Sequence, residues 1–378
     1  MTRSTIAHVR WHEVRVSPKT VWSFVELVDT QGAVGTGEAT LGRREAPMRA
    51  AIARFEGAVK GRTPIDVDLE QHRAAATALP EFAVLSALDQ AAWDLAAQQQ
   101  GVSVSDALGA RQRDSVVAYA NINRGIDPRT EAGFAAHARR AVADGFAAIK
   151  IAPFDGVELY GDERRALEPK LLDVALGRIA AVRDAIGPDV HLMVDCHWRL
   201  NRAAAERVLD ATAPHALYWL ECPVPERPDM LDTLRHLRGR ANDRGVRLAG
   251  CEEMSLLQGF APFLAAGVYD VMMPDVKYVG GMREMLKVAD AFREHGVGFS
   301  PHNPSGPVCH AASLQVCAVA SSLERLEMQY AETPLFDALV NGALPRPARG
   351  EIAVPRAPGL GVRLEPQLVK QLATAVSA

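Results

Sequence analysis

Residues 115 to 335 alternate between short apolar segments and longer amphipathic segments, and this alternation constrains the fold more than any other feature of the chain. The short segments have the composition of buried parallel strands, and the longer ones have the periodicity of helices that cover a sheet. Eight such units over roughly 220 residues favour a (β/α)8 barrel. The expected strands are Val116–Ala120, Phe146–Ile151, Val190–Asp195, Ala216–Glu221, Val246–Glu252, Tyr269–Pro274, Val297–Ser300 and Arg325–Met328. The expected helices include Glu131–Asp144, Arg165–Ile186, Ala203–Ala211, Met230–Asn242 and Met282–His295.

An open, doubly wound α/β sheet is the alternative to a barrel. Such a sheet usually carries a glycine-rich phosphate-binding turn after its first strand. The segment Ala120–Arg124, which ends the first expected strand and follows it, is not of that type. We therefore predict an α/β fold of the (β/α)8, or TIM-barrel, type for residues 115–335.

The regions on either side of the barrel have different patterns. Residues 1–114 begin with two alternating, strand-like segments joined by a turn at Asp29–Gly32, and two Ala- and Leu-rich helical segments follow, which indicates a small α+β domain. Residues 336–378 begin with a stretch rich in Pro and Gly, which predicts extended or turn structure rather than helix and packing back on the first region. The strands expected in the first region are His8–Val16 and Trp22–Val28, and its helices are Met48–Val59 and Phe82–Gln99.

The overall composition excludes several classes of protein. The 42 basic and 46 acidic residues give a net charge of -4, so the composition has no excess of basic residues and argues against nucleic acid as a partner. No segment reaches the ~18 apolar residues that a membrane span needs. The first residues lack the apolar stretch of a secretory signal, and five cysteines without paired spacing suit a reducing compartment. We expect a cytoplasmic protein.

Three consecutive expected strands end in a carboxylate, at Asp195, Glu221 and Glu252. Because barrel chemistry is built at the C-terminal ends of the strands, these side chains should converge on one rim. Three oxygen ligands without a His or Cys partner suit Mg²⁺. The alternative is that each acid caps the next helix, and a second ambiguity is whether Glu252 or Glu253 points inward.

Cysteines 196, 222 and 251 stand next to these three acids, which raises the possibility of a zinc site. Side chains alternate along a strand, so the neighbours of inward-facing acids face the helices. The chain also lacks the CxxC spacing of structural zinc sites. We interpret the three cysteines as small packing residues.

Several motifs in this order resemble the enolase superfamily, specifically its mandelate racemase-type group. In the first region, Thr36-Gly37-Glu38-Ala39 and the segment Ser86–Leu95 are similar to parts of that family's capping domain. The resemblance implies that residues 1–114 are a capping domain, completed by residues 336–378. In the barrel, it implies metal ligands at Asp195, Glu221 and Glu252, a dyad of Asp275 with His302, and an acid at Glu327. The closing segment Pro358–Gly361 is similar as well.

The resemblance implies abstraction of the proton α to a carboxylate, with Mg²⁺ stabilising the charge that develops. Lys150, at the end of the second expected strand, would serve as a nearby ammonium or as a base. His302, oriented by Asp275, would be the principal base. Related enzymes of another group carry a catalytic Lys in the place of Asp275, and we interpret Lys277 as a loop or surface cation rather than that base.

Two positions separate the reactions known in this group. His197 lies two residues after Asp195 and matches the general acid of dehydratases that act on galactonate-like acids, although a loop histidine is the competing interpretation. Ala152 stands where racemases of the group carry the second Lys of a Lys-x-Lys motif, which weakens a two-base racemase without excluding it. Candidates for binding the substrate are Asn121, Asn123, Arg124, Arg199, Arg43 and Arg44.

The expected function is a Mg²⁺-dependent acid-sugar dehydratase that yields a 2-keto-3-deoxy acid. An isomerase, either a racemase/epimerase or a cycloisomerase of a carboxylate, is the first alternative. A barrel without enzymatic activity is the second, and the complete set of ligands and dyad counts against it. The partner would be a small carboxylate, with no nucleic acid or membrane, and the resemblance implies a homo-oligomer.

Overall fold

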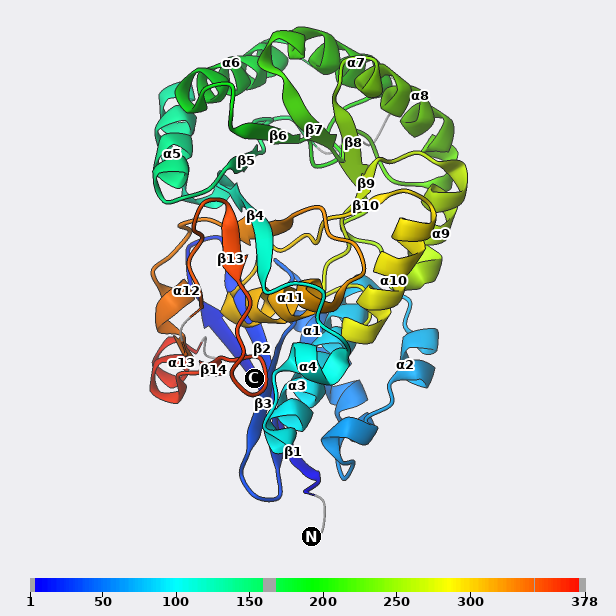
Figure 1. Cartoon of the computed structure of the whole chain (residues 1–378), viewed down its shortest axis with the longest axis vertical. Coiled ribbons are helices and arrows are strands. Elements are labelled where there is room, and N and C mark those ends of the chain that lie inside the picture. Colours follow the sequence, from blue (N-terminus) through cyan, green and yellow to red (C-terminus); the bar gives the residue numbers. More distant parts are fainter. Residues whose placement is uncertain (1–3, 159–167, 343, 374–378) are drawn as a thin grey trace.

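The strands of the barrel region form a single parallel sheet that curls into a ring (Figure 1). The computed structural model describes residues 4–158, 168–342 and 344–373. The strand order is β10-β9-β8-β7-β6-β5-β4-β11, with every neighbouring pair parallel. Two backbone hydrogen bonds, from Glu324 N to Phe299 O at 2.7 Å and from Glu327 N to Pro301 O at 3.2 Å, connect the two ends of this sheet. The predicted barrel is therefore confirmed.

The barrel elements follow the expected order, although several strands are shorter than predicted. The strands are β4 (Ser115–Asn121), β5 (Ala148–Ile151), β6 (His191–Asp195), β7 (Leu217–Glu221), β8 (Arg247–Gly250), β9 (Val271–Met272), β10 (Gly298–Phe299) and β11 (Leu326–Gln329). The helices are α5 (Glu131–Ala143), α6 (Pro169–Ile186), α7 (Arg202–Ala211), α8 (Leu231–Asn242), α9 (Leu256–Ala266), α10 (Met282–Glu294) and α11 (Pro307–Val319). The first residues predicted for the second helix, 165–167, lie outside the described part of the chain.

The barrel interior explains how the strands aim their last residues. Side chains inside the ring form a separate apolar cluster that includes Ala148, Met193 and Trp219. Residues two positions apart on a strand share a face, so the side chains that follow these by two residues also point inward. The alternation therefore directs the side chains of Lys150, Asp195 and Glu221 into the ring, at the C-terminal ends of their strands.

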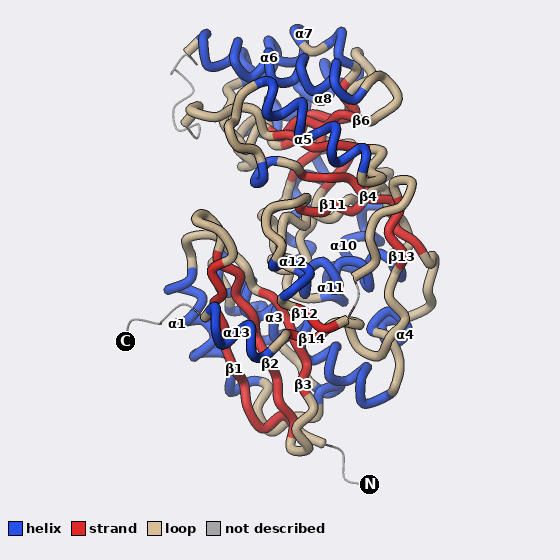
Figure 2. Tube along the Cα trace, turned by 90° about the vertical axis from the view of Figure 1, so that its left-hand side faces the viewer, coloured by secondary structure: helices blue, strands red, loops and turns tan. Residues whose placement is uncertain are grey.

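An antiparallel sheet and helices below the barrel form the capping domain (Figures 1 and 2). Its helix α3 lies directly against β3, because Gly35 and Gly37 leave room for it. A Cβ at Gly35 would lie 2.2 Å from Ala91 O, and one at Gly37 would lie 2.0 Å from Ala87 O. The elements are β1 (Ile6–Arg15), β2 (Val21–Asp29), β3 (Val34–Glu38), α1 (Glu45–Phe55), α2 (Glu70–Ala75), α3 (Leu79–Gln100) and α4 (Val104–Leu108). The turn at Asp29–Gly32 joins β2 to β3, not β1 to β2 as the sequence suggested.

The C-terminal segment contacts both parts of the molecule. It packs on the capping domain through a bridge between Val14 and Ala373 and through a hydrogen bond from Leu360 N to Asp94 at 2.8 Å, whereas β13 pairs with barrel strand β4. The prediction of a segment without helix is wrong, because a helix of seven residues begins at Pro366. Proline at the first helical position is favourable because it needs no amide partner there. The elements are α12 (Leu335–Ala338), β12 (Val340–Asn341), β13 (Glu351–Ala353), β14 (Arg363–Leu364) and α13 (Pro366–Leu372).

Candidate active site

A cleft of about 240 Å³ opens at the C-terminal ends of the barrel strands. Strand ends, the loops after them and the loop after β3 of the capping domain all contribute to its wall. A larger cavity, of about 320 Å³ near Trp22, Tyr330 and Phe336, contains none of the predicted catalytic or metal-ligating residues. The lining of the cleft consists of Thr40, Gly42, Asn121, Asn123, Arg124, Asp195, His197, Glu252, Lys277, Tyr278, His302 and Pro304.

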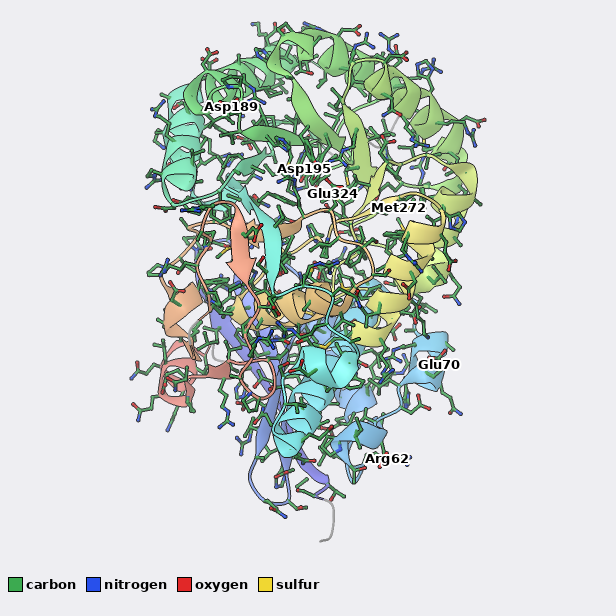
Figure 3. All side chains as sticks on the ribbon, in the orientation of Figure 1. Arg62, Glu70, Asp189, Asp195, Met272 and Glu324 are labelled. Atoms are coloured by element: carbon green, nitrogen blue, oxygen red, sulfur yellow. The ribbon has the colours of Figure 1, made fainter. Side chains whose placement is uncertain are left out.

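Asp195, Glu221 and Glu252 form one buried group in which one carboxylate oxygen from each residue lies within 4.8 Å of the other two. Figure 3 shows Asp195 inside the ring of strands. Within the described ranges this is the only such group of acidic, His or Cys side chains. Its all-oxygen donor set fits a hard divalent cation.

The charges of these acids show that the site is unbalanced without a cation. Burial, together with Asp195 and Glu327, raises the pKa of Glu221 to about 8 despite the opposing effect of Lys150. Burial and the same kind of carboxylate repulsion raise the pKa of Glu252 well above its ordinary value. Burial also acts against ionisation of Asp195, but His197 and Lys150 outweigh it and lower that pKa to about 2. A divalent cation would supply the positive charge that the group lacks.

The backbone after β8 determines which of two adjacent glutamates faces this group. Strand β8 ends at Gly250, and Cys251 has a φ of 71°, so the chain turns before Glu252. Glu226 holds this turn by accepting a hydrogen bond from Cys251 N at 2.6 Å and another from the Tyr269 hydroxyl at 2.8 Å. Glu252 is consequently buried in the group, whereas Glu253 is exposed.

Lys150 is completely buried between two carboxylates. Its Nζ donates to Glu221 Oε1 at 2.5 Å and lies 3.0 Å from Glu327 Oε1. Burial lowers the pKa of Lys150, but Glu221 and Glu327 outweigh that effect and raise the pKa well above its ordinary value. This arrangement fits an ammonium more closely than a base. Glu327 also accepts hydrogen bonds from Asn121 Nδ2 at 2.6 Å and from Asn303 N at 3.0 Å.

His302 lies against Asp275 on the other side of the cleft. Its Nδ1 is 2.8 Å from Asp275 Oδ2, and its Nε2 is 3.6 Å from Glu252 Oε2. The carboxylate therefore orients the ring so that Nε2 faces the acidic group. The loops after β9 and β10 position the pair, and a hydrogen bond of 3.2 Å from His302 N to Pro274 O joins these loops.

Lys277 lies in the loop after β9, as one part of the interpretation had it, but it is buried, which contradicts the other part, a surface cation. Only 1% of it is exposed, and its Nζ donates to Asp275 Oδ2 at 2.5 Å and to the Ser305 hydroxyl. The surface interpretation failed because Ser305, which accepts one of these bonds, lies 28 residues away in sequence. Asp275 thus has a histidine and a lysine as partners, where the sequence predicted the histidine alone.

His197 contacts Asp195 from a tight turn. Its φ is 46°, its backbone N donates to Asp195 Oδ1 at 2.8 Å, and its Nε2 is 2.9 Å from Asp195 Oδ2. The side chain is 41% exposed, so it faces the cleft and remains accessible to a small molecule. The two-residue spacing predicted this proximity, although the backbone here is not extended as a strand would be.

The structure divides the predicted substrate-binding residues into two sets. Asn121, Asn123 and Arg124 line the cleft, and Asn121 Oδ1 accepts a hydrogen bond from Asn123 Nδ2 at 2.6 Å. Arg43 and Arg44 are exposed, and Arg199 donates to Val157 O. As far as the described residues define the cleft, these last three do not line it.

Three residues of the lining that lie at the capping domain were not predicted from the sequence, namely Thr40, Gly42 and Tyr278. Thr40 follows the Thr36–Ala39 motif directly, and Tyr278 donates its hydroxyl hydrogen bond to Thr40 O at 3.2 Å. The position of Thr40 so close to a recognised motif was the one available signal. Tyr278 had none, because nothing local indicates that its loop meets the capping domain.

The five cysteines are all free and buried. Cys196 and Cys251 pack in the apolar layer outside the ring, which agrees with the alternation argument. Cys222 Sγ lies 3.7 Å from Glu226 and 3.9 Å from Glu252. Burial raises the pKa of each of these three thiols well above its ordinary value, as expected of packing residues.

None of the described helices is both long enough and apolar enough to cross a bilayer.

Comparisons with known proteins identify relatives along nearly the whole chain. A D-gluconate dehydratase of Thermoproteus tenax is 31% identical over 355 residues, covering 92% of this chain and 69% of the relative. A D-galactonate dehydratase of Variovorax paradoxus is 30% identical over 372 residues, covering 95% of this chain and 92% of the relative.

Solved structures and family models agree with these relatives. The structure of a mandelate racemase/muconate lactonizing enzyme-like protein from Rubrobacter xylanophilus is 28% identical, has a TM-score of 0.88, and covers 100% of this chain and 99% of its own. Residues 1–109 match the mandelate racemase / muconate lactonizing enzyme N-terminal domain, and residues 133–368 match the enolase C-terminal domain-like family. The chain therefore belongs to the enolase superfamily, in its mandelate racemase-type group.

Proposed function

We propose that this protein is a Mg²⁺-dependent acid-sugar dehydratase that removes the proton α to a carboxylate and expels the β-hydroxyl as water. The observation that carries the proposal is the placement of His302 Nε2, 3.6 Å from Glu252 Oε2, which belongs to a buried group of three acids. A base and a cation site on facing sides of one cleft are what this reaction needs. The dehydratase names of the two curated relatives also support it.

Asp195, Glu221 and Glu252 would hold the cation. Both oxygens of Glu221 are already oriented, one by Lys150 and the other by Trp219 Nε1 at 2.9 Å. Bound Mg²⁺ would stabilise the negative charge that develops on the substrate carboxylate as the α-proton leaves, an effect of several kcal/mol. Lys150 adds a fixed positive charge to the same side of the cleft.

His302 would accept the α-proton at Nε2. The contact of Nδ1 with Asp275 holds the ring in the tautomer that leaves Nε2 unprotonated, and the negative charge of Asp275 favours the imidazolium that forms. The electron pair of the broken C–H bond stays on the substrate, delocalised between the α-carbon and the carboxylate. It then drives the loss of the β-hydroxyl.

His197 would donate the proton with which the β-hydroxyl departs as water. Its ring faces the cleft, and its contact with Asp195 keeps it close to the cation site. The enol that results rearranges to a 2-keto-3-deoxy acid, so the net change is the loss of one water molecule. Asn121, Asn123 and Arg124 would bind the remaining hydroxyl groups of the substrate.

Isomerisation is the second candidate, and one position argues against its two-base form. Ala152 follows β5 at the position of the second lysine, so no second lysine extends from this strand. The backbone N of Ala152 donates to the Asn123 side chain. Lys150, the remaining lysine of the motif, is held as an ammonium by two carboxylates. One base on one face of the cleft favours elimination over racemisation.

Incubation with a panel of sugar acids and Mg²⁺ tests the proposal, with D-gluconate and D-galactonate first. Semicarbazide detects the 2-keto acids that dehydration would produce, and EDTA should abolish the signal. A protein that forms no 2-keto acid but exchanges the α-proton of an acid with D₂O would be an isomerase. Activity that survives complete removal of divalent metal would contradict the role of the three acids.

A further inference from the structure

The least expected contact in the cleft is the bond between Lys277 and Asp275. Asp275 Oδ2 is shared by Lys277 Nζ at 2.5 Å and His302 Nδ1 at 2.8 Å, while Asp275 Oδ1 accepts Lys277 N at 2.8 Å. The lysine therefore binds both oxygens of the carboxylate that orients the proposed base. A carboxylate held at both oxygens has little freedom to rotate.

Lys277 also connects the two loops that carry the pair. It lies in the loop after β9, and its second Nζ partner, the Ser305 hydroxyl, lies in the loop after β10, three residues beyond His302. One ammonium thus joins the segment that contains Asp275 to the segment that contains His302. Without it, the described contacts between these loops would be the Asp275–His302 bond and backbone hydrogen bonds such as that from His302 N to Pro274 O.

The capping domain holds the same two loops from the opposite direction. Glu38, at the end of β3, accepts hydrogen bonds from Gly306 N at 2.8 Å and Cys309 N at 2.9 Å, at the start of α11. Gln90 of α3 donates to Val276 O at 3.3 Å and to Glu38 O at 3.3 Å. Burial raises the pKa of Glu38, and the positive charge of Lys277 acts in the opposite direction, which shows that the two groups are close.

We propose that Lys277 is a positioning residue for the reaction. Its ammonium holds Asp275 and the loop that contains Ser305 in place, and these in turn determine the direction of His302 Nε2. Glu38 and Gln90 of the capping domain hold the same two loops from the other side. The proposal rests on the function proposed above. It assigns to the capping domain a part in aligning the base, in addition to lining the cleft.

Electrostatics supports a permanent ammonium at this position. Burial lowers the pKa of Lys277, but Asp275 outweighs burial and raises the pKa above its ordinary value. The cation therefore acts as a fixed counter-charge and donor, and does not itself exchange the substrate proton. Such a group affects turnover through the geometry of His302.

The test is the Lys277→Met variant, which keeps the length of the side chain and removes the charge. We expect kcat to fall by about 10²-fold, because small displacements of an aligned catalytic group cost about that much. KM for the acid and the affinity for Mn²⁺, used as a probe of the metal site, should change by less than about twofold. Lys287→Met is the matched control, since Lys287 is exposed and pairs with Glu284 on α10, and it should leave all three quantities unchanged.

NMR of protein labelled with ¹⁵N-histidine gives a readout that does not depend on activity. The Nδ1 resonance of His302, assigned by its absence in His302→Asn, should shift in Lys277→Met as the bond to Asp275 loosens. Ser305→Ala removes the second anchor without leaving Asp275 unpaired, so it covers the case in which Lys277→Met does not fold. It should shift the same resonance and lower kcat by about tenfold, the effect expected for one hydrogen bond to a charged group.

Three results would overturn the assignment. The first is an unchanged kcat in folded Lys277→Met. The second is a rise in KM with kcat retained, and the third is a loss of kcat with the His302 resonance unmoved. The second or the third result would make Lys277 a substrate contact. If the native protein dehydrates no sugar acid, the proposed function fails, yet the resonance still reports whether Lys277 positions His302. The two failures are therefore distinguishable.

Discussion

The two sides of the cleft balance their charges in different ways. On the side of β5 to β8 and β11, four carboxylates are buried, at Asp195, Glu221, Glu252 and Glu327, and the one ammonium there, that of Lys150, pairs with Glu221 and Glu327. On the side of β9 and β10, the carboxylate of Asp275 is paired with both Lys277 and His302. The first side depends on protons or on a metal cation from solution to offset its carboxylates, whereas the second is complete within the chain.

This difference separates two kinds of sensitivity. The acidic side should respond to metal and to proton concentration, because both compete for the same oxygens. The side with the dyad should respond to substitutions that move its loops, since its partners are already in place. The following predictions, in decreasing order of effect, test whether the two sides fail in these different ways.

Glu221→Gln should cause the largest loss, because it removes one ligand and the partner of Lys150 together. We expect kcat/KM for dehydration to fall by more than about 10⁴-fold, since loss of several kcal/mol of charge stabilisation corresponds to that range. Titration calorimetry with Mg²⁺ should show weakened binding in the same variant. Normal turnover with weak metal binding would show that the acidic side is not catalytic.

His302→Asn should lower dehydration by about 10³-fold, within the range typical for loss of a general base. Its metal affinity should remain normal, because the histidine is not one of the three acids. Steady-state assays and calorimetry on one preparation make the comparison. Simultaneous loss of metal binding would mean that the two sides are not separable.

His197→Asn should separate the two halves of the reaction. Dehydration should fall by about 10²-fold, the lower end of the range for a general acid, while exchange of the substrate α-proton with D₂O continues. Proton NMR of the recovered substrate measures the exchange. If neither rate changes, His197 is a loop histidine without a catalytic part.

The smallest effect concerns stability and pH in the metal-free protein. The pKa of Glu221 is about 8 in the folded chain against an ordinary value of 4.5, so its stabilising contribution is complete below 4.5 and is lost as pH rises through 8. The metal-free protein should therefore melt a few degrees lower at pH 8.5 than at pH 6, and Mg²⁺ should remove much of that difference.

Glu221→Gln is the control for this experiment. Its neutral amide cannot ionise, so the pH dependence that belongs to this group should be smaller than in the native chain. Differential scanning calorimetry with and without EDTA measures both proteins. An equal pH dependence in the two would assign the effect to another buried acid, such as Asp94, whose pKa is raised to about 6.

The sequence was sufficient for features that depend on strand periodicity. Asp195 and Glu221 end two consecutive expected strands, so their place at the C-terminal ends predicted that they converge on one rim of the barrel. Glu252 was ambiguous because its direction depends on the turn at Cys251, which Glu226 holds from another loop. The catalytic roles stay predictions that the experiments above address, and the domain limits stay predictions as well.

Features that depend on distant contacts were beyond local patterns. Lys277 is buried because of Asp275 and Ser305, and no motif in its own loop indicates the second of these partners. The helix Pro366–Leu372 was missed because the Pro- and Gly-rich stretch before it dominated the interpretation of the whole segment. For Lys277 the deciding interactions join residues from separate loops, whereas the helix was missed for a local reason.

The burial of all five cysteines has a practical consequence for experiments on this protein. A thiol introduced on the exposed capping loop, at Arg43 for instance, would be the sole one readily reached by a maleimide reagent. A fluorophore attached there would stand close to Gly42, at the mouth of the cleft. Its emission could then report the arrival of a ligand in real time, without removal of any native cysteine.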